Sequence, residues 1–490
     1  MSERPTVCLI LEGSYPYITG GVSSWVHQLI LYLEQIDFVL YTISPAADQE
    51  LRYELPANVV GHKDLVLSAP VRGRRRPKDL RGLLRQITAI HKPLLQGNVP
   101  DLQQLITQIP RGYSLYADGI KSHEGWALLS SQNQKKNPIY AFADYFWAWK
   151  SAHDMMFAVL ADHAPQADLY HPVSTGYAGL AALSAKIRTG RPLILTEHGL
   201  YHKEREMEIR KAQFIRGYQR DMWTGIFNNL SRLCYRYADL IVALFEHNRR
   251  LQIELGAPGD RTRVIPNGID VPFYSAVVRR KRKGFHVGLI GRVVPIKDVK
   301  TFISMSKIVS EAIPEATFHC IGPTDEDPGY FEDCQILVES LRLADRFHFT
   351  GRQDVRSYYA FLDVLLLTSV REAQPLVILE AYCAGVPVVA TRVGNVAELL
   401  DYDERFIASS KDPVKLAAAV KHIYDHPDEM KAIVERNRDR VIRFYDRDKV
   451  FQTYGDLYRR YSAAGGQNRH SGASLKPAEP CGQAPTGEGR

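Results

Sequence analysis

The first 43 residues alternate short apolar runs with one amphipathic stretch. Residues 7–11 and 38–43 are apolar runs of the length expected for buried strands of a parallel sheet. Between them, a loop with Gly20 and Gly21 leads into a predicted helix. Its apolar positions recur every three or four residues, at Val22, Trp25, Val26, Leu29, Ile30 and Leu33. A strand, a glycine loop, a helix and a strand form the unit of a doubly wound α/β sheet.

The pattern loosens at about 69–164 into helical and aromatic-rich stretches, which we interpret as an insertion into this first domain. Strand-like runs resume at 169–171, 193–196 and 240–243. The pattern restarts after a basic segment at 279–283, with strands predicted at 285–290, 316–321, 347–349 and 364–367 and a helix at 299–313. The sequence thus predicts a first domain at 1–278 and a second α/β domain at 284–440.

The end of the chain divides into two parts. Residues 441–462 are predicted to form a helix that returns to the first domain. Residues 463–490 are rich in Gly, Ala, Pro and Ser and nearly lack large apolar side chains, so we expect a disordered tail.

Glu372 and Glu380 frame the most informative segment. Pro375 suits a first helical residue, because its missing N–H has no partner there. We therefore expect a helix at 376–384 that ends at Gly385, followed by a buried strand at 387–391. A helix N-terminus attracts an anion, and carboxylates accept hydrogen bonds from hydroxyls. The segment therefore predicts a nucleotide-sugar pocket.

Composition narrows the class of protein. At 490 residues, with 45% hydrophobic and 24% charged residues, the chain predicts two or three globular domains. It shows no secretory signal and no apolar run near the ~20 residues that span a bilayer, so we expect a cytoplasmic protein. Six scattered cysteines include no C-x-x-C pair, which indicates reduced thiols.

The net charge of +7 is concentrated in the basic segments 72–76 and 279–283. Such runs usually form solvated loops, and contact with an anionic membrane surface or an acidic partner is the alternative. We expect no nucleic-acid partner, because no aromatic platform or binding motif accompanies the basic residues.

The chain resembles the retaining glycosyltransferases of family 4, which have the GT-B fold of two facing Rossmann-like domains with a central cleft. The matches occur in order along the chain. They are Gly20-Gly21-Val22, Thr196-Glu197-His198-Gly199, Ile265-Pro266-Asn267-Gly268-Ile269-Asp270, Gly291-Arg292 with Lys297, and Glu372 to Glu380 followed by Gly385-Val386-Pro387-Val388-Val389-Ala390-Thr391.

The opening segment at 11–25, together with the length and the insertion, is similar to the cytosolic glycosyltransferases of Pel exopolysaccharide synthesis. One segment departs from the family. Many members carry a Gly-Phe-Gly-like sequence after the first glutamate, and this chain has Ala373-Gln374-Pro375, which puts the specificity for the sugar in doubt.

The resemblance implies a catalytic set of His198, Arg292, Lys297 and Glu372. Arg292 and Lys297 would bind the donor phosphates, where fixed cations stabilise the charge that develops on the leaving group. His198 would lie beside the donor sugar and orient a hydroxyl, and Glu372 would bind hydroxyls of the transferred sugar. Outside this motif set, two cations after a strand would be taken for ordinary surface residues.

Further residues are expected to bind substrate. Gly20 and Gly21 let the backbone approach the donor phosphate, although a Gly-Gly pair is also common in ordinary turns. Glu380 would bind the ribose, and Ser369 the phosphates. Glu197 either holds His198 or meets the acceptor, Glu398 is a further candidate, and Glu12 with Tyr15 would line the acceptor side. The loop from His171 to Gly176 is either cleft-facing or purely structural.

The predicted activity is retaining transfer of a hexose from a UDP-sugar, by resemblance UDP-glucose, to a growing polysaccharide. No cofactor or metal is expected, although His198 and His202 have the i,i+4 spacing of a metal pair. An inner-membrane synthase and export complex is the expected partner, with the insertion as its docking surface. Two alternatives stay open: a GT-B nucleotide-sugar 2-epimerase, and a non-catalytic nucleotide-sugar-binding subunit of a membrane synthase.

Overall fold

The computed structural model describes residues 4–67, 77, 79–96, 99–134, 142–212, 215 and 217–467. The chain forms two compact units. Among the described residues, unit 1 comprises those up to Ile265 together with Phe451 to Gln467, and unit 2 comprises Pro266–Val450. The basic segment 72–76 lies outside the described residues.

Unit 1 is built on parallel strands. Four of them form a sheet in the order β3-β2-β1-β4 and three more follow in the order β5-β6-β7, with a parallel bridge between Tyr170 and Leu193 joining the two sets. The strand runs predicted at 7–11, 38–43, 169–171, 193–196 and 240–243 are confirmed. The bounds are β1 Thr6–Glu12, β2 Asp37–Ser44, β3 Val59–Val66, β4 Leu169–Pro172, β5 Ile194–Glu197, β6 Leu240–Ala243 and β7 Thr262–Val264.

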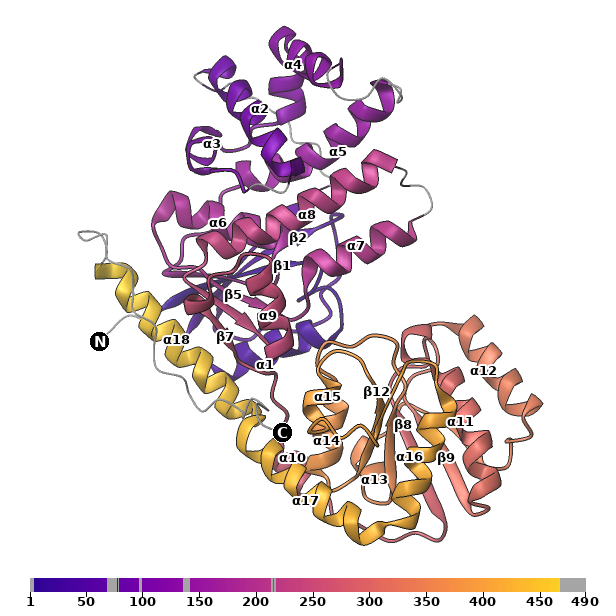
Figure 1. The fold of residues 1–490 in the computed structure, drawn as a ribbon. Helices are drawn as coiled ribbons and strands as arrows, with labels where there is room; N and C mark the ends of the chain where they lie inside the picture. Colours follow the sequence, from indigo (N-terminus) through magenta and orange to yellow (C-terminus); the bar gives the residue numbers. More distant parts are fainter. Residues whose placement is uncertain are drawn as a thin grey trace. The chain divides into compact units, whose positions relative to one another are not determined.

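Helices cover this sheet, and the predicted insertion is helical. Figure 1 shows α2, α3, α4 and α5 gathered at one end of unit 1, beyond α6 and α8. Their buried side chains join the same core as those of α6 and α8. The bounds are α1 Gly21–Tyr32, α2 Leu80–Gln96, α3 Gln103–Gln108, α4 His123–Gln134, α5 Phe142–Ala161, α6 Gly176–Thr189, α7 Tyr201–Lys211, α8 Gly217–Tyr237 and α9 Glu246–Glu254.

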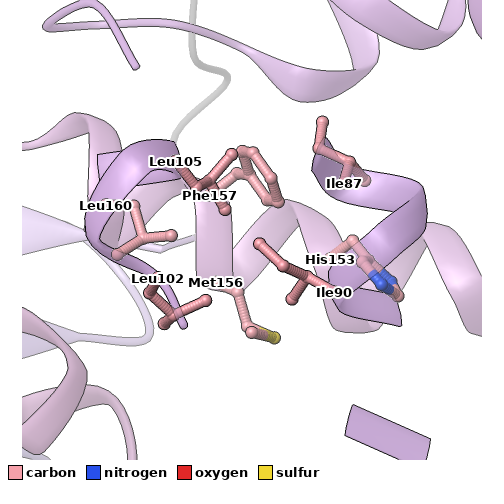
Figure 2. Close-up of a pocket in the computed structure, with 8 residues that line it drawn as sticks. All are labelled: Ile87, Ile90, Leu102, Leu105, His153, Met156, Phe157 and Leu160. Atoms are coloured by element: carbon pink, nitrogen blue, oxygen red, sulfur yellow. The ribbon is translucent and has the colours of Figure 1, made fainter. Parts of the chain in front are cut away.

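An apolar cavity lies among the helices of the insertion (Figure 2). Its volume of about 10 Å³ holds at most about one water molecule, so it is no substrate pocket. One polar residue lines it: His153 is 3% exposed, stacks on Trp149 at 4.0 Å and bonds the Trp149 carbonyl through Nδ1. Burial lowers the pKa of His153 to about 4.

Replacing His153 by leucine should make the protein less sensitive to acid. The unfolded chain binds a proton at His153 below about pH 6.5 and the folded chain only near pH 4, so His153 destabilises the fold increasingly as the pH falls between these values. Between pH 7.5 and pH 5, the free energy of unfolding of His153→Leu should gain about 2 kcal/mol on that of the wild type. Urea unfolding at both pH values measures this gain, and an equal difference at the two would contradict it.

Unit 2 contains one six-stranded parallel sheet in the order β10-β9-β8-β11-β12-β13. Numbered from its first strand, this is the 3-2-1-4-5-6 order of the doubly wound dinucleotide-binding fold. The bounds are β8 Phe285–Ile290, β9 Ala316–Ile321, β10 Phe347–Gly351, β11 Val364–Leu367, β12 Val388–Thr391 and β13 Ile407–Ala408, with α10 Val271–Ser275, α11 Val299–Ala312, α12 Pro328–Ser340, α13 Val355–Tyr359, α14 Leu376–Cys383, α15 Val396–Leu399, α16 Pro413–Asp425 and α17 Pro427–Phe444.

The division between the units falls earlier than the expected boundary near 278. Residues from Pro266 pack on unit 2, because Ile269 bridges Asp446 and Val271 is buried in the unit 2 core. The residues of the basic segment 279–283 are all exposed, as expected for a solvated loop, and the side chain of Arg279 also bonds to the protein backbone. Arg279 donates to the carbonyls of Tyr359 and Leu362 at the end of α13, where a cation suits the helix dipole.

The last helix, α18 (Arg447–Gln467), contributes its residues from Phe451 onward to unit 1. The expected disordered tail is therefore wrong for its first residues, since 463–467 continue this helix, and the rest of the tail, 468–490, lies outside the described residues. Within the described part of the chain, no helix combines the length and the apolar character needed to span a membrane.

Candidate active site

The sheet of unit 2 changes winding direction between β8 and β11. From β8 the chain proceeds outward to β9 and β10, and from β11 it proceeds the other way to β12 and β13. Ligands of doubly wound sheets bind at the carboxyl ends of the strands at this point. The two segments that leave it are 291–298 and 368–375. They hold Arg292, Lys297, Ser369 and Glu372.

Lys297, Ser369 and Glu372 meet here. The Nζ atom of Lys297 lies 2.5 Å from Oε1 of Glu372, and Oγ of Ser369 donates to the same oxygen at 2.8 Å. The side chains of Lys297 and Glu372 are 21% and 18% exposed, so the pair is partly shielded from water. The cluster offers a cation for a phosphate next to a carboxylate for a hydroxyl.

The turn that carries Lys297 and the neighbouring strand ends hold this residue in place. A 3-10 turn at Pro295–Lys297 ends at Asp298, whose φ of 48° is left-handed and whose carboxylate caps α11 by accepting from Thr301. Thr368, at the end of β11, donates to the Lys297 carbonyl at 2.7 Å. The stem of Lys297 passes over Gly291, where a Cβ would lie 3.6 Å from Cε. The ammonium group is therefore held at the ends of both strands.

The turn that carries Glu372 differs in one detail from the prediction. Pro375 has ψ 100° and is the N-cap, so the expectation that it is the first helical residue is wrong, and α14 begins at Leu376. Its extended ψ leaves the carbonyl free to accept from the Ile378 N–H at 3.2 Å, as an N-cap carbonyl does. The expected end of the helix at Gly385 is confirmed, with φ 79°.

The loop after β12 packs tightly on the same turn. Gly394 has φ 51°, and a Cβ there would lie 2.1 Å from the Ala373 carbonyl oxygen and 2.5 Å from that of Glu372. The next N–H, that of Asn395, donates to the Ala373 carbonyl at 3.1 Å. Only glycine fits at 394, and this contact fixes the backbone of Glu372.

Glu380 lies on α14 but is held by tyrosines. Tyr359 donates to its Oε2 at 3.2 Å, and burial raises the pKa of Glu380 while the hydroxyls of Tyr274 and Tyr359 oppose that rise. The two phenols fix the carboxylate in one orientation.

Arg292 and Glu398 each have a partner outside the Lys297 cluster. Arg292 is about half exposed and pairs with both oxygens of Glu326, at 2.5 and 2.8 Å. Glu398 lies on α15, its carbonyl accepts from Arg440 of α17, and its carboxylate acts on the pKa of Tyr445.

In unit 1, His198 follows the end of β5 and is 8% exposed. Its ring meets Trp25 of α1 edge-on at 4.6 Å, and its Nε2 has no hydrogen-bond partner among the described residues. Burial lowers the pKa of His198 to about 4, so the ring is neutral near pH 7. A neutral ring nitrogen without a partner can bond a hydroxyl.

The carboxylate of Glu197 is fully engaged within unit 1. It is 0% exposed and accepts four hydrogen bonds of 2.6–3.2 Å. Its partners are the Tyr201 N–H and the side chains of Thr175, Tyr235 and Gln252. Burial raises its pKa, and these donors oppose the rise. Of the two roles expected for it, the bonds favour holding the segment of His198.

Glu12 is engaged in the same way at the end of β1. Its carboxylate accepts from the N–H groups of Tyr177 and Ala178 at 2.9 and 3.2 Å and from the Tyr201 hydroxyl at 2.7 Å. It thus satisfies free amides at the N-terminus of α6. Tyr15 is buried as well and bonds His27 at 3.2 Å.

Gly20 and Gly21 have no steric need to be glycine within the chain. A Cβ at either would meet nothing within 4 Å, the φ of 170° at Gly20 is extended backbone that any residue adopts, and Gly21 is not among the glycines with a left-handed φ. His171, in contrast, is purely internal: it is 0% exposed and bonds Tyr458 at 2.6 Å and Thr196 at 2.9 Å.

No group of three or more possible metal-ligating side chains occurs among the residues that the structure describes. Trp25, Thr368 and Asn395 contact or support the candidate residues but are not among the residues predicted from sequence to form the site. Each lies within five residues of a motif residue, and this closeness along the chain is the one feature of the sequence that points to a role in the site.

Two family descriptions match the chain. The description "Domain of unknown function (DUF3492)" matches residues 5–260, more than half of the chain, and "Glycosyl transferases group 1" matches residues 284–426. The second match covers most of unit 2, including Arg292, Lys297, Ser369, Glu372, Glu380 and Glu398.

Two curated relatives show the range of likeness. N-acetyl-alpha-D-glucosaminyl L-malate synthase of Bacillus anthracis is 27% identical over 246 residues, 47% of this chain and 62% of that protein. UDP-Gal:alpha-D-GlcNAc-diphosphoundecaprenol alpha-1,3-galactosyltransferase of Escherichia coli is 23% identical over 308 residues, 59% and 75% of the two chains. The match thus spans less than two thirds of the first relative.

Among solved structures, Anabaena Alr3699/HepE in complex with UDP matches with a TM-score of 0.58 and 17% identity, over 92% of this chain and 99% of that one. At this identity the likeness shows the fold, and it confirms the predicted GT-B class. The chain therefore belongs to the family described as Domain of unknown function (DUF3492), and its unit 2 carries a domain of the glycosyl transferases group 1 family within a GT-B fold.

Proposed function

We propose that this protein is a retaining, metal-independent glycosyltransferase that transfers a hexose from a UDP-sugar, UDP-glucose by resemblance, to a growing exopolysaccharide. The PelF-type enzymes of Pel exopolysaccharide synthesis are the type that its opening segment resembles. The observation that carries the proposal is the cluster of Lys297, Ser369 and Glu372 at the switch point of a group 1 domain.

Charge explains the proposed role of the cations. The diphosphate gains negative charge as its bond to the sugar breaks, and a fixed cation stabilises that charge more in the transition state than in the ground state. Lys297 is already held at the strand ends. Arg292 lies just after β8, and its side chain is about half exposed. Both bind the diphosphate, with Ser369 as an additional donor.

The two glutamates bind hydroxyl groups. Glu372 reads the transferred sugar, since its carboxylate adjoins the cation that holds the phosphate. Glu380 accepts hydrogen bonds from the ribose hydroxyls. Because two phenols already hold its carboxylate, this side chain loses less conformational entropy on binding.

The reaction proceeds on one face of the sugar. The acceptor hydroxyl attacks the anomeric carbon from the side on which the bond to the β-phosphate oxygen breaks. Its proton passes to an oxygen of the departing diphosphate, so the configuration is retained and no protein carboxylate becomes a covalent nucleophile. The chain's task is to position the reactants, stabilise the leaving group and exclude water.

In unit 1, His198 orients a sugar hydroxyl through its unpartnered Nε2, and Glu197 fixes the segment that carries it. The open space at Gly20 and Gly21 fits the approach of a donor phosphate to the backbone. Glu12 holds the start of α6 on the acceptor side.

Known proteins support the choice of donor. The Escherichia coli relative is named for UDP-Gal, and the Anabaena structure contains UDP. A thermal-shift panel of UDP, GDP, ADP and their sugars, with EDTA present, tests the proposal. UDP and UDP-glucose should raise the Tm, and a hundredfold excess over Kd corresponds to about 2.7 kcal/mol. No shift with any nucleotide, or the same shift in Lys297→Ala, would reject it.

We also propose a cytoplasmic location beside an inner-membrane synthase and export complex, with the insertion as the docking surface. Trp126 on α4 is 51% exposed and Trp147 on α5 is 59% exposed, and both contact Phe146. Exposed aromatic clusters mark interaction surfaces. The double variant Trp126→Ser, Trp147→Ser should keep transfer activity and lose membrane recruitment in cell fractions, whereas unchanged recruitment would count against this surface.

A further inference from the structure

Asn395 is a buried amide without a partner. The residue is 3% exposed, and neither its Oδ1 nor its Nδ2 has a hydrogen-bond partner among the described residues. Such groups are rare in folded proteins, because burying an unpaired polar atom forfeits its bonds to water. The unpaired amide of Asn395 therefore destabilises the free protein.

The usual structural use of asparagine at this place does not apply. Asn395 is the N-cap of α15, where its side chain could accept from an amide of the first turn, yet it makes no capping bond. The chain satisfies amides elsewhere: Nδ2 of Asn58 donates to the carbonyls of Ile30, Leu33 and Ile36 at 2.9–3.3 Å.

The position of Asn395 connects it with the active-site turn. Its N–H donates to the Ala373 carbonyl at 3.1 Å, and the preceding Gly394 packs on the carbonyls of Glu372 and Ala373. Asn395 therefore lies one backbone contact from the residue that bears the carboxylate paired with Lys297.

A second buried amide belongs to the same turn. Gln374 is 7% exposed, its Oε1 accepts from the Asn267 N–H at 2.8 Å, and its Nε2 has no partner. Two under-bonded amides beside Glu372 indicate a polar, uncharged ligand group, since a phosphate would be met by the adjoining Lys297.

We propose that Asn395 determines specificity for the donor by bonding a polar substituent of the transferred sugar next to Glu372. This inference rests on the proposed function. An amide both donates and accepts, which matches either a hydroxyl or an acetamido group on the sugar. Binding of the substituent gives the amide hydrogen-bond partners. Only the correct donor therefore removes the free-energy penalty of burying an unpaired amide.

The test is Asn395→Leu, which keeps the approximate volume and removes the amide. The Tm of the free variant should equal or exceed that of the wild type, because no bond within the chain is lost. The affinity for UDP should not change, while kcat/KM for the preferred donor should fall at least tenfold. Comparing UDP-glucose with UDP-N-acetylglucosamine shows whether the lost partner is a hydroxyl or an acetamido group.

Asn58→Leu serves as the control, since it removes an amide with three bonds. It should lower the Tm and leave the ratio of the two donors unchanged. If Asn395→Leu behaves in this way, its amide is structural, bonded through buried water, and the inference is overturned. If the wild type neither binds nor turns over any UDP-sugar, the proposed function fails instead.

Discussion

Lys297→Ala should lower kcat/KM for sugar transfer by about 10²- to 10³-fold, the usual effect of removing one preorganised group that stabilises transition-state charge. Lys297 is the partly buried cation at the switch point of unit 2, and its side chain is only 21% exposed. A cation held in this way needs little reorganisation when charge develops on the diphosphate. Nucleotide release in the presence of acceptor measures the rate, and a thermal shift with UDP measures the loss of phosphate binding.

Lys300→Ala is the matched control. Lys300 lies three residues further on, in α11, and pairs with Asp333 at 2.7 Å on a side chain that is 40% exposed. Exposed ion pairs contribute little, so transfer should stay near the wild-type rate. If Lys297→Ala kept near-normal transfer and Lys300→Ala transferred more slowly, the result would show that the phosphate does not bind at the switch point.

Glu372→Gln should separate nucleotide binding from transfer. In the free protein, the carboxylate of Glu372 pairs with the ammonium group of Lys297, so a phosphate must compete with this carboxylate for the cation. Removing the charge releases Lys297, and the affinity for UDP should stay equal or increase. Transfer should fall by about 10²-fold or more, because the bond to the sugar hydroxyl is weakened in the transition state.

Calorimetric titration with UDP, followed by turnover with UDP-glucose, distinguishes these two effects. Glu315→Gln is the control, since Glu315 lies outside the site and bonds the Tyr424 hydroxyl. A parallel loss of UDP affinity and transfer in Glu372→Gln would show that Glu372 supports the fold of the site and does not read the sugar.

Local pattern was sufficient for most of the fold. The apolar runs gave the central strands of both sheets, because strands buried on both faces are continuous in hydrophobicity. The edge strand β3 was not predicted. Its sequence at 59–66 places Gly61, His62, Lys63 and Asp64 in a strand with one free edge, where polar residues are tolerated.

The sequence predicted some residues of the candidate site better than others, because the partners of a side chain can lie far away along the chain. Glu12 was expected on the acceptor side, and Glu197 was expected either to meet the acceptor or to hold His198. The structure engages both carboxylates in internal bonds. The donors include Tyr177 and Tyr235, which lie 165 and 38 residues away from their acceptors along the chain. No motif spacing carries that information.

The sequence by itself determined the α/β class and the order of the motifs, because periodicity, glycines and prolines act within a few residues of the chain. Only the tertiary structure decided the bonding of each polar group. It paired Lys297 with Glu372 across 75 residues, saturated Glu197, and left His198 and Asn395 buried with unpartnered atoms. The physical reason is that a side chain's charge state and hydrogen bonds depend on neighbours that folding brings together from distant parts of the chain.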